Sequence, residues 1–160
     1  MKTINVYQIN EHPEPSKVYG WIRSNWNDLN SHSVNEVVAS CAALAQHLGL
    51  TLDYSICAVP DQGEYIKFKN ASGTVLTHGV GDSLLQGNCA LTGVCWDEDL
   101  LDAFHQADDD DELSDVLENA SQKVLTTLHG DTDHQYSDEG LKELCEENGY
   151  YFFECGSIAD

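Results

Sequence analysis

Histidine and carboxylate side chains are densest between His129 and His134, in the segment HGDTDH. Two imidazoles and two carboxylates within six residues are a donor set that a divalent metal ion accepts. A helix that ends at Gly130 and continues as a polar loop explains the same residues without a metal, because glycine and histidine are common at helix C-termini. We therefore expect no bound metal and no cofactor. A small metal-dependent cytosolic enzyme that uses this loop is kept as an alternative.

Six cysteines supply the other reactive groups. Cys41 and Cys145 lie on expected apolar helix faces, where a thiol packs as a small hydrophobe. Cys89 and Cys95 are separated by five residues, which is wider than the spacing within structural zinc sites. No local signature pairs a cysteine with a histidine, and the chain has no P-loop, G-x-G-x-x-G or H-E-x-x-H motif. The sequence thus predicts free thiols, no catalytic residues and a protein that is not an enzyme.

Carboxylates dominate the charged groups, with 28 Asp and Glu against 7 Lys and Arg and a formal net charge of -21. A field of this sign repels phosphates, which disfavours direct binding to nucleic acid or to an anionic membrane. The imbalance is uneven. Residues 1–96 hold 8 acids against 5 bases, whereas residues 97–147 hold 18 acids against Lys123 and Lys142 alone. This segregation predicts a concentrated acidic surface and a basic partner.

Helical periodicity places many of these acids on exposed faces. Apolar residues recur with a 3.6-residue period from Leu113 to Leu128, which predicts an amphipathic helix over residues 112–129. Ser137 as a cap and Gly149 as a stop predict a further helix. Neighbouring like charges on a helix cost roughly a few tenths of a kcal/mol per pair, so their retention indicates a use. The residues expected to bind the partner are Asp97, Glu98, Asp99, Asp109, Asp110, Asp115, Glu118, Glu139, Glu143 and Glu146.

The rest of the chain is predicted to mix helices with a small sheet. Residues 33–48 carry an apolar stripe between a Ser33–Glu36 capping box and Gly49, which indicates a helix. Alternating or aromatic stretches predict strands at residues 4–9, 52–58, 65–69, 74–78 and 150–155, while residues 19–26 fit both a strand and a helix. We expect an α+β fold in which a small antiparallel sheet of about 4–5 strands packs against about 3–4 helices. The sequence predicts one domain, residues 1–160, with an acidic helical segment at 97–147.

Trp21 and Trp26 flank Arg23 in the segment VYGWIRSNWNDLN, which has the residue types of an interaction hot spot. Both tryptophans are also suited to cover the sheet as large hydrophobes, and we favour that interpretation. The segment stays as an alternative contact surface.

The N-terminal residues and the cysteines together predict a cytoplasmic location. No apolar run approaches the roughly 18 residues of a membrane-spanning helix. Glu11 and Glu14 stand where a secretion signal needs an apolar block. Thiols that stay reduced fit a reducing compartment.

The composition resembles that of DNA-mimic proteins encoded by phages and mobile elements, such as anti-restriction and anti-CRISPR proteins, in size, charge and segregation of charge. This resemblance implies a non-enzymatic inhibitor that occupies the basic groove of a DNA- or RNA-handling protein, as in evasion of host defence. Duplex DNA carries one charge per roughly 1.7 Å of axis, a density that two or three packed acidic helices approach. An alternative is an immunity or antitoxin-type module that neutralises a basic protein. A homodimer is compatible with either.

Overall fold

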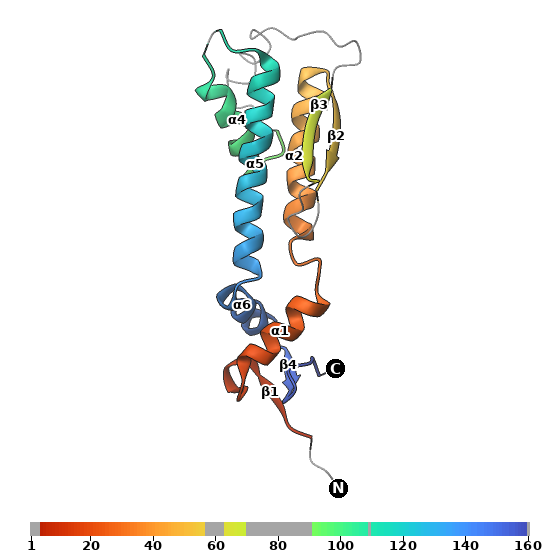
Figure 1. Ribbon diagram of the computed structural model, residues 1–160, viewed down its shortest axis with the longest axis vertical. Helices are drawn as coiled ribbons and strands as arrows, with labels where there is room; N and C mark the ends of the chain where they lie inside the picture. Colours follow the sequence, from red (N-terminus) through yellow and green to blue (C-terminus); the bar gives the residue numbers. More distant parts are fainter. Residues whose placement is uncertain (1–3, 57–62, 70–90, 109, 160) are drawn as a thin grey trace. The chain divides into compact units, whose positions relative to one another are not determined.

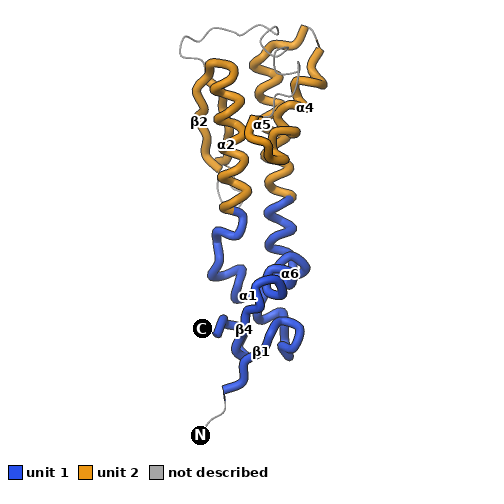
Figure 2. Tube along the Cα trace, turned by 180° about the vertical axis from the view of Figure 1, so that it is seen from behind, with its two compact units in different colours: residues 1–30, 131–160 blue, residues 31–130 orange. Residues whose placement is uncertain are grey.

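The part of the chain that the computed structural model describes, residues 4–56, 63–69, 91–108 and 110–159, mixes five α-helices with four short strands (Figure 1). In chain order the elements are β1 (Val6–Gln8), the 3-10 helix η1 (Ile9–Glu11), α1 (Pro15–Asn25), α2 (Ser31–Leu48), β2 (Thr51–Ser55), β3 (Tyr65–Lys69), α4 (Trp96–Gln106), α5 (Leu113–Gln135), α6 (Asp138–Asn148) and β4 (Tyr151–Phe153). The chain divides into two compact units (Figure 2). Unit 1 is residues 1–30 with 131–160, and unit 2 is residues 31–130.

Unit 1 packs α1 and α6 with the antiparallel pair β1 and β4. Tyr7 lies opposite Phe152 in this pair, and the Phe152 side chain is fully buried. Pro15 begins α1, a position where the missing N–H removes no helical hydrogen bond. The core of the unit consists of Ile9, Val18, Tyr19, Ile22, Leu141, Cys145 and Phe152.

Both ends of α6 confirm the sequence prediction. The Ser137 hydroxyl accepts a hydrogen bond from the Gly140 N–H at 3.1 Å, which satisfies one of the free donors of the first turn. Gly149 ends the helix with φ 64°, a left-handed conformation that glycine adopts without a steric penalty. Leu141 and Cys145 face the core between these ends, as expected.

Unit 2 contains the antiparallel pair β2 and β3 together with α2, α4 and residues 113–130 of α5. The two strands pair along five residues, from Thr51 opposite Lys69 to Ser55 opposite Tyr65. Apolar side chains of all three helices share one core, whose largest fully buried members are Val37, Leu44, Leu100, Val124 and Leu128. The packing of this core determines which faces of α4 and α5 are exposed to solvent.

The helix predicted at residues 33–48 is confirmed, with an earlier start. It begins at Ser31, so Ser33 lies inside the helix and is not its N-cap. Glu36 accepts a hydrogen bond from the Trp96 indole N–H at 3.1 Å, which joins α2 to α4. Gly49, with φ 68°, follows the helix as expected.

The described strands form two sheets of two strands each, whereas the sequence indicated one sheet of about 4–5 strands. β4 pairs with β1 in unit 1 and β3 pairs with β2 in unit 2, so each pair serves a different core. The strand expected at residues 74–78 lies outside the described residues. Residues 19–25, which fitted both a strand and a helix, belong to α1.

The helix α5 extends beyond the end that the sequence predicted. A stop was expected at Gly130, but the helix runs to Gln135. Leu128 and Thr132 are both buried, four residues apart on one helix face. Glycine in a helix interior costs about 1 kcal/mol relative to alanine, and the packing of this face outweighs that cost.

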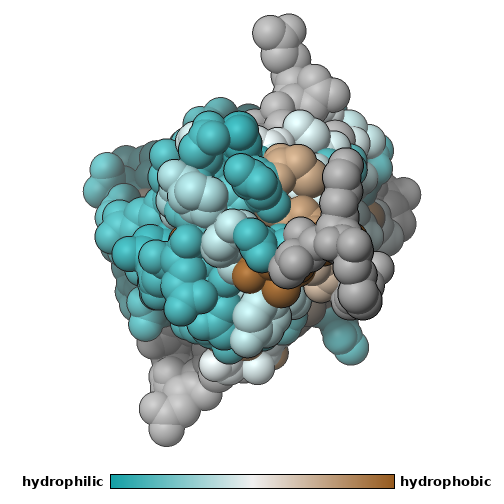
Figure 3. All heavy atoms as spheres, turned by 90° about the horizontal axis from the view of Figure 1, so that it is seen from below, coloured by the Kyte–Doolittle hydropathy of each residue, from teal (hydrophilic) through white to brown (hydrophobic). Residues whose placement is uncertain are grey.

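One face of the molecule is mainly polar. In the face shown in Figure 3, hydrophilic residues cover most of the area and hydrophobic residues form a small patch. The exposed large hydrophobic residues of the described chain are Ile4, Val6, Tyr54 and Tyr151. None of its helices combines the length and apolar character needed to cross a membrane.

Candidate functional site

The ten acids expected to bind a partner divide between the two units. Seven belong to unit 2, namely Asp97, Glu98, Asp99, Asp109, Asp110, Asp115 and Glu118, and Asp109 lies outside the described residues. The other three, Glu139, Glu143 and Glu146, belong to α6 of unit 1.

In unit 2 the acids follow α4, the connection 107–112 and the first two turns of α5, which together are termed the acidic hairpin. Leu100, Ala103 and Phe104 bury one side of α4. The opposite side leaves Glu98 exposed and Asp99 and Asp102 partly exposed. A surface hollow of about 410 Å³ lies on this side, lined by Glu98, Asp99, Leu101, Asp102 and His105.

Lys123 is the only Lys or Arg in residues 97–130. It lies on α5 and forms an ion pair with Asp102 of α4. This ion pair neutralises one carboxylate of the acidic hairpin. Residues 97–130 contain no further Lys or Arg to neutralise the remaining carboxylates.

The connection between α4 and α5 carries five consecutive acids, residues 108–112. Asp111 accepts a hydrogen bond from the Asp108 N–H at 2.8 Å, which closes a turn. The carbonyl of Glu112 accepts the N–H groups of Asp115 and Val116 and so begins α5. Negative charge at this position is favoured by the helix dipole. Asp111 and Glu112 thus have a local structural role, while Asp110 is fully available at the surface.

Asp115 and Glu118 occupy the outward face of the first turns of α5, as the periodicity predicted. Val116, Leu117 and Ala120 alternate with them and are buried. Glu118 accepts a hydrogen bond from Gln122 at 3.2 Å.

Asp97 differs from the other acids, because its side chain is buried and not outward. Only 5% of the residue is exposed. Its carboxylate accepts hydrogen bonds of 2.8 Å from the N–H groups of Thr92 and Gly93 and from the hydroxyls of Thr92 and Ser40. Burial would raise the pKa of Asp97, but these hydrogen bonds outweigh it and hold the pKa below its ordinary value. Asp97 fastens α4 to α2 and cannot contact a partner from this position.

The α6 acids Glu139, Glu143 and Glu146 are exposed, as expected. Glu143 Oε2 lies 3.6 Å from His134 Nε2, and Glu146 Oε1 lies 3.7 Å from Lys142 Nζ. Exposed pairs of this kind contribute little to stability. These carboxylates therefore remain accessible to a charged partner.

The His129–His134 segment is helical and does not form the expected loop. His129 pairs with Glu64, whose side chain is 4% exposed. Asp131 accepts a hydrogen bond from Gln135 at 2.8 Å. Among the described residues, no three His, Cys, Asp or Glu side chains are grouped as a metal ion requires. The donors of this segment are thus spread along and around α5.

The described cysteines, Cys41, Cys95, Cys145 and Cys155, are free. Burial raises the pKa of Cys41 to about 12 and that of Cys145 to about 11. A buried thiol with a raised pKa packs as a small hydrophobe, which confirms the prediction for these two residues. Cys57 and Cys89 lie outside the described residues.

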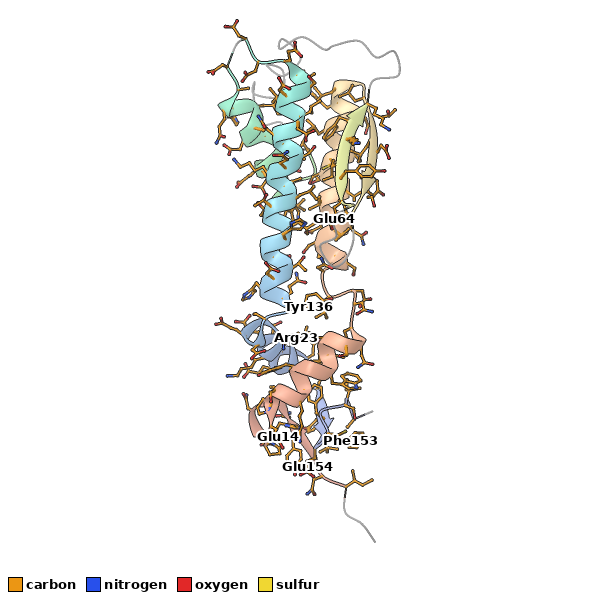
Figure 4. The ribbon with its side chains drawn as sticks, viewed as in Figure 1. Glu14, Arg23, Glu64, Tyr136, Phe153 and Glu154 are labelled. Atoms are coloured by element: carbon orange, nitrogen blue, oxygen red, sulfur yellow. The ribbon has the colours of Figure 1, made fainter. Side chains whose placement is uncertain are left out.

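Trp21 and Trp26 contribute to the core of unit 1. Their rings meet edge to face at 6.0 Å, and Trp26 meets Tyr150 in the same way at 5.5 Å. Both tryptophans are partly buried against the core. This burial favours a role in covering the core and does not favour a role in partner contact. Arg23, next to them, bonds to the Tyr136 carbonyl at 2.9 Å and pairs with Asp138, so it holds the turn between α5 and α6 (Figure 4).

The ten acids expected to bind a partner leave out five further acids that lie at the surface. Asp102, Asp108, Asp111 and Glu112 belong to the acidic hairpin, and Glu147 belongs to the exposed side of α6. The charge pattern already contained the signal, because all five lie within residues 97–147. The burial of Asp97 had no local signal, since it depends on Ser40 in a distant helix.

Comparison of the chain with models of known families, with curated proteins and with solved structures finds no match.

Proposed function

We propose that the protein is a non-enzymatic inhibitor that occupies the nucleic-acid-binding groove of a basic partner protein. The observation that carries the proposal is the acidic hairpin. Its described residues present carboxylates from two helices and their connection, with Lys123 as the only Lys or Arg of residues 97–130. These exposed or partly exposed acids are Glu98, Asp99, Asp102, Asp108, Asp110, Asp111, Glu112, Asp115 and Glu118.

The spacing of these carboxylates supports mimicry of a nucleic-acid backbone. A helix rises about 1.5 Å per residue, so acids three or four residues apart lie about 4.5–6 Å apart along its axis. A partner groove lined by Lys and Arg gains many moderate charge pairs from such an array, and no single pair dominates. Asp97 is not among them, because its carboxylate is already used inside the protein.

Charge reversal on the acidic hairpin tests the proposal. The partner is first identified by mass spectrometry of proteins retained from a lysate of the source organism, and its affinity for the purified protein is then measured. The triple variant Asp110→Lys, Asp115→Lys and Glu118→Lys should weaken this affinity by about a hundredfold or more, since three favourable charge pairs become repulsive. Its fold should be retained, because all three side chains are exposed.

A matched control reverses three exposed acids away from the hairpin. The variant Glu11→Lys, Asp28→Lys and Glu154→Lys makes the same change in net charge and leaves the acidic hairpin intact. We expect it to weaken binding by less than about fivefold through the change in overall field alone. Equal weakening by both variants would show that the acids serve solubility and that the contact surface lies elsewhere.

A further inference from the structure

Unit 1 contains a cavity of about 190 Å³ between the end of α5, one face of α6 and the segment that follows α1. Sites for drug-sized ligands measure roughly 300–1,000 Å³, so this cavity is suited to a smaller occupant. The size of the cavity corresponds to the end of one long side chain.

α5 and α6 approach each other closely beside the cavity. A Cβ at Gly140 would collide with the carbonyl oxygen of His134, so a glycine is required where the two helices meet. Glu143, Leu144 and Glu147 follow Gly140 at the spacing of one helix face and form one wall.

The lining combines apolar walls with acceptors. Leu29 and Leu144 are partly buried and supply apolar surface, while Glu143 and Glu147 supply two carboxylates one helical turn apart. Gln135 also lines the cavity, and its buried Oε1 accepts no hydrogen bond within the described part of the chain. The amide nitrogen of the same side chain donates to Asp131 at 2.8 Å, which holds Gln135 in place beside the cavity.

We propose that this cavity receives an arginine side chain of the basic partner, an inference that rests on the proposed function. A guanidinium is planar, carries five N–H donors and is weakly hydrated on its faces. It can lie against the leucine walls while its edge donates to Glu143 and Glu147, in place of the 3.6 Å contact between Glu143 and His134, which also lines the cavity. A lysine ammonium offers a compact, strongly hydrated charge that matches the carboxylates but gains less from the apolar walls.

Titration with a small arginine compound tests the inference without any partner protein. The probe is Nα-acetyl-arginine N-methylamide, with the corresponding lysine and citrulline compounds as comparisons, and binding is followed by amide chemical shifts of the full chain. Saturable shifts should centre on Leu29, Gly140 and Leu144. The citrulline compound, which lacks the charge, should not bind.

A matched pair of variants on α6 separates the cavity from general acidity. Glu143→Gln with Glu147→Gln should weaken arginine binding by about tenfold, because both cavity carboxylates are lost. Glu139→Gln with Glu146→Gln removes the same charge from the same helix outside the cavity and should change binding by less than about twofold. The single variant Glu147→Gln, with a melting curve recorded for each protein, gives a second measure with a smaller change to the fold.

Several results would overturn the inference. These are equal weakening by the two double variants, shifts away from the cavity, binding of citrulline, or lysine binding as tight as arginine binding. Failure here leaves the proposed function standing if charge reversal of the acidic hairpin still weakens partner binding. Conversely, arginine binding in the cavity with no effect of that reversal would contradict the proposed function alone.

Discussion

Asp97 shows how one carboxylate in an acidic chain can have a role opposite to that of its neighbours. Glu98 and Asp99 add negative charge to the surface of α4, whereas Asp97 has its charge fully engaged by Ser40, Thr92 and Gly93. A buried carboxylate is tolerated only when hydrogen bonds replace the water that it has lost. The composition of residues 97–99 cannot separate these roles, because the separation depends on which side of α4 meets α2.

Replacement of Asp97 by Asn should destabilise the protein. The amide removes the charge and turns an acceptor into a donor that faces other donors, which costs about 2–4 kcal/mol of unfolding free energy. Denaturant unfolding at neutral pH measures the loss. The control Asp99→Asn, on the outer side of the same helix turn, should change the free energy by less than about 0.5 kcal/mol. A near-neutral Asp97→Asn variant would contradict the assigned hydrogen-bonded role.

Acid should remove the advantage that Asp97 provides. Its pKa is lower in the folded protein than in the unfolded chain, so the folded state keeps the carboxylate charged to lower pH. The stabilisation is then complete above the unfolded pKa of about 3.9 and is lost as pH falls through the folded pKa. The stability difference between the native chain and Asp97→Asn should be constant near neutrality and should shrink below about pH 4. A difference that grows on acidification would contradict the assignment.

At the scale of elements, the sequence predicted helices well where local signals marked both ends. Ser137 and Gly149 bound α6 as expected, because capping and a left-handed glycine are local effects. Gly130 was misread as a stop, because the burial of Leu128 and Thr132 depends on the rest of the fold. The sequence also did not reveal that β1 pairs with β4, because these two strands come from opposite ends of the chain.

Two glycine substitutions distinguish a helix interior from a helix end. Gly130→Ala should stabilise the protein by about 0.5–1 kcal/mol, because alanine favours the helix. A Cβ there meets no described atom within 4 Å. Gly149→Ala should destabilise it by about 1 kcal/mol, because φ 64° is unfavourable for alanine. Thermal unfolding of both variants checks these two predictions. A destabilised Gly130→Ala variant would contradict the helix at this position and support the loop that the sequence predicted.

Over the whole molecule, negative charge belongs to both units. Unit 2 holds 16 acids against 3 bases, and unit 1 holds 12 acids against 4 bases. The sequence predicted the segment of highest charge, residues 97–147, but not its division between α4 and α5 of unit 2 and α6 of unit 1. Contact between residues far apart in the chain determines that division, and no local pattern encodes it.

Salt should stabilise the whole protein. Repulsion among surface carboxylates opposes folding, and the Debye length falls from about 30 Å to about 3 Å between 0.01 M and 1 M salt. We expect the melting temperature to rise by about 5 °C or more over this range, as measured by circular dichroism with sodium chloride. A constant or falling melting temperature would show that the acids are compensated within the fold, and would remove the basis for a concentrated negative surface.

Competition with duplex DNA for the captured partner tests the central claim most directly. Labelled DNA is bound to the partner, unlabelled protein is titrated in, and release of the DNA is followed by fluorescence anisotropy at several salt concentrations. A nucleic-acid mimic should displace the DNA completely, with an apparent affinity that falls steeply as salt rises. A partner that holds the protein and the DNA together in a ternary complex would contradict the claim and would favour an immunity-type module that binds outside the groove.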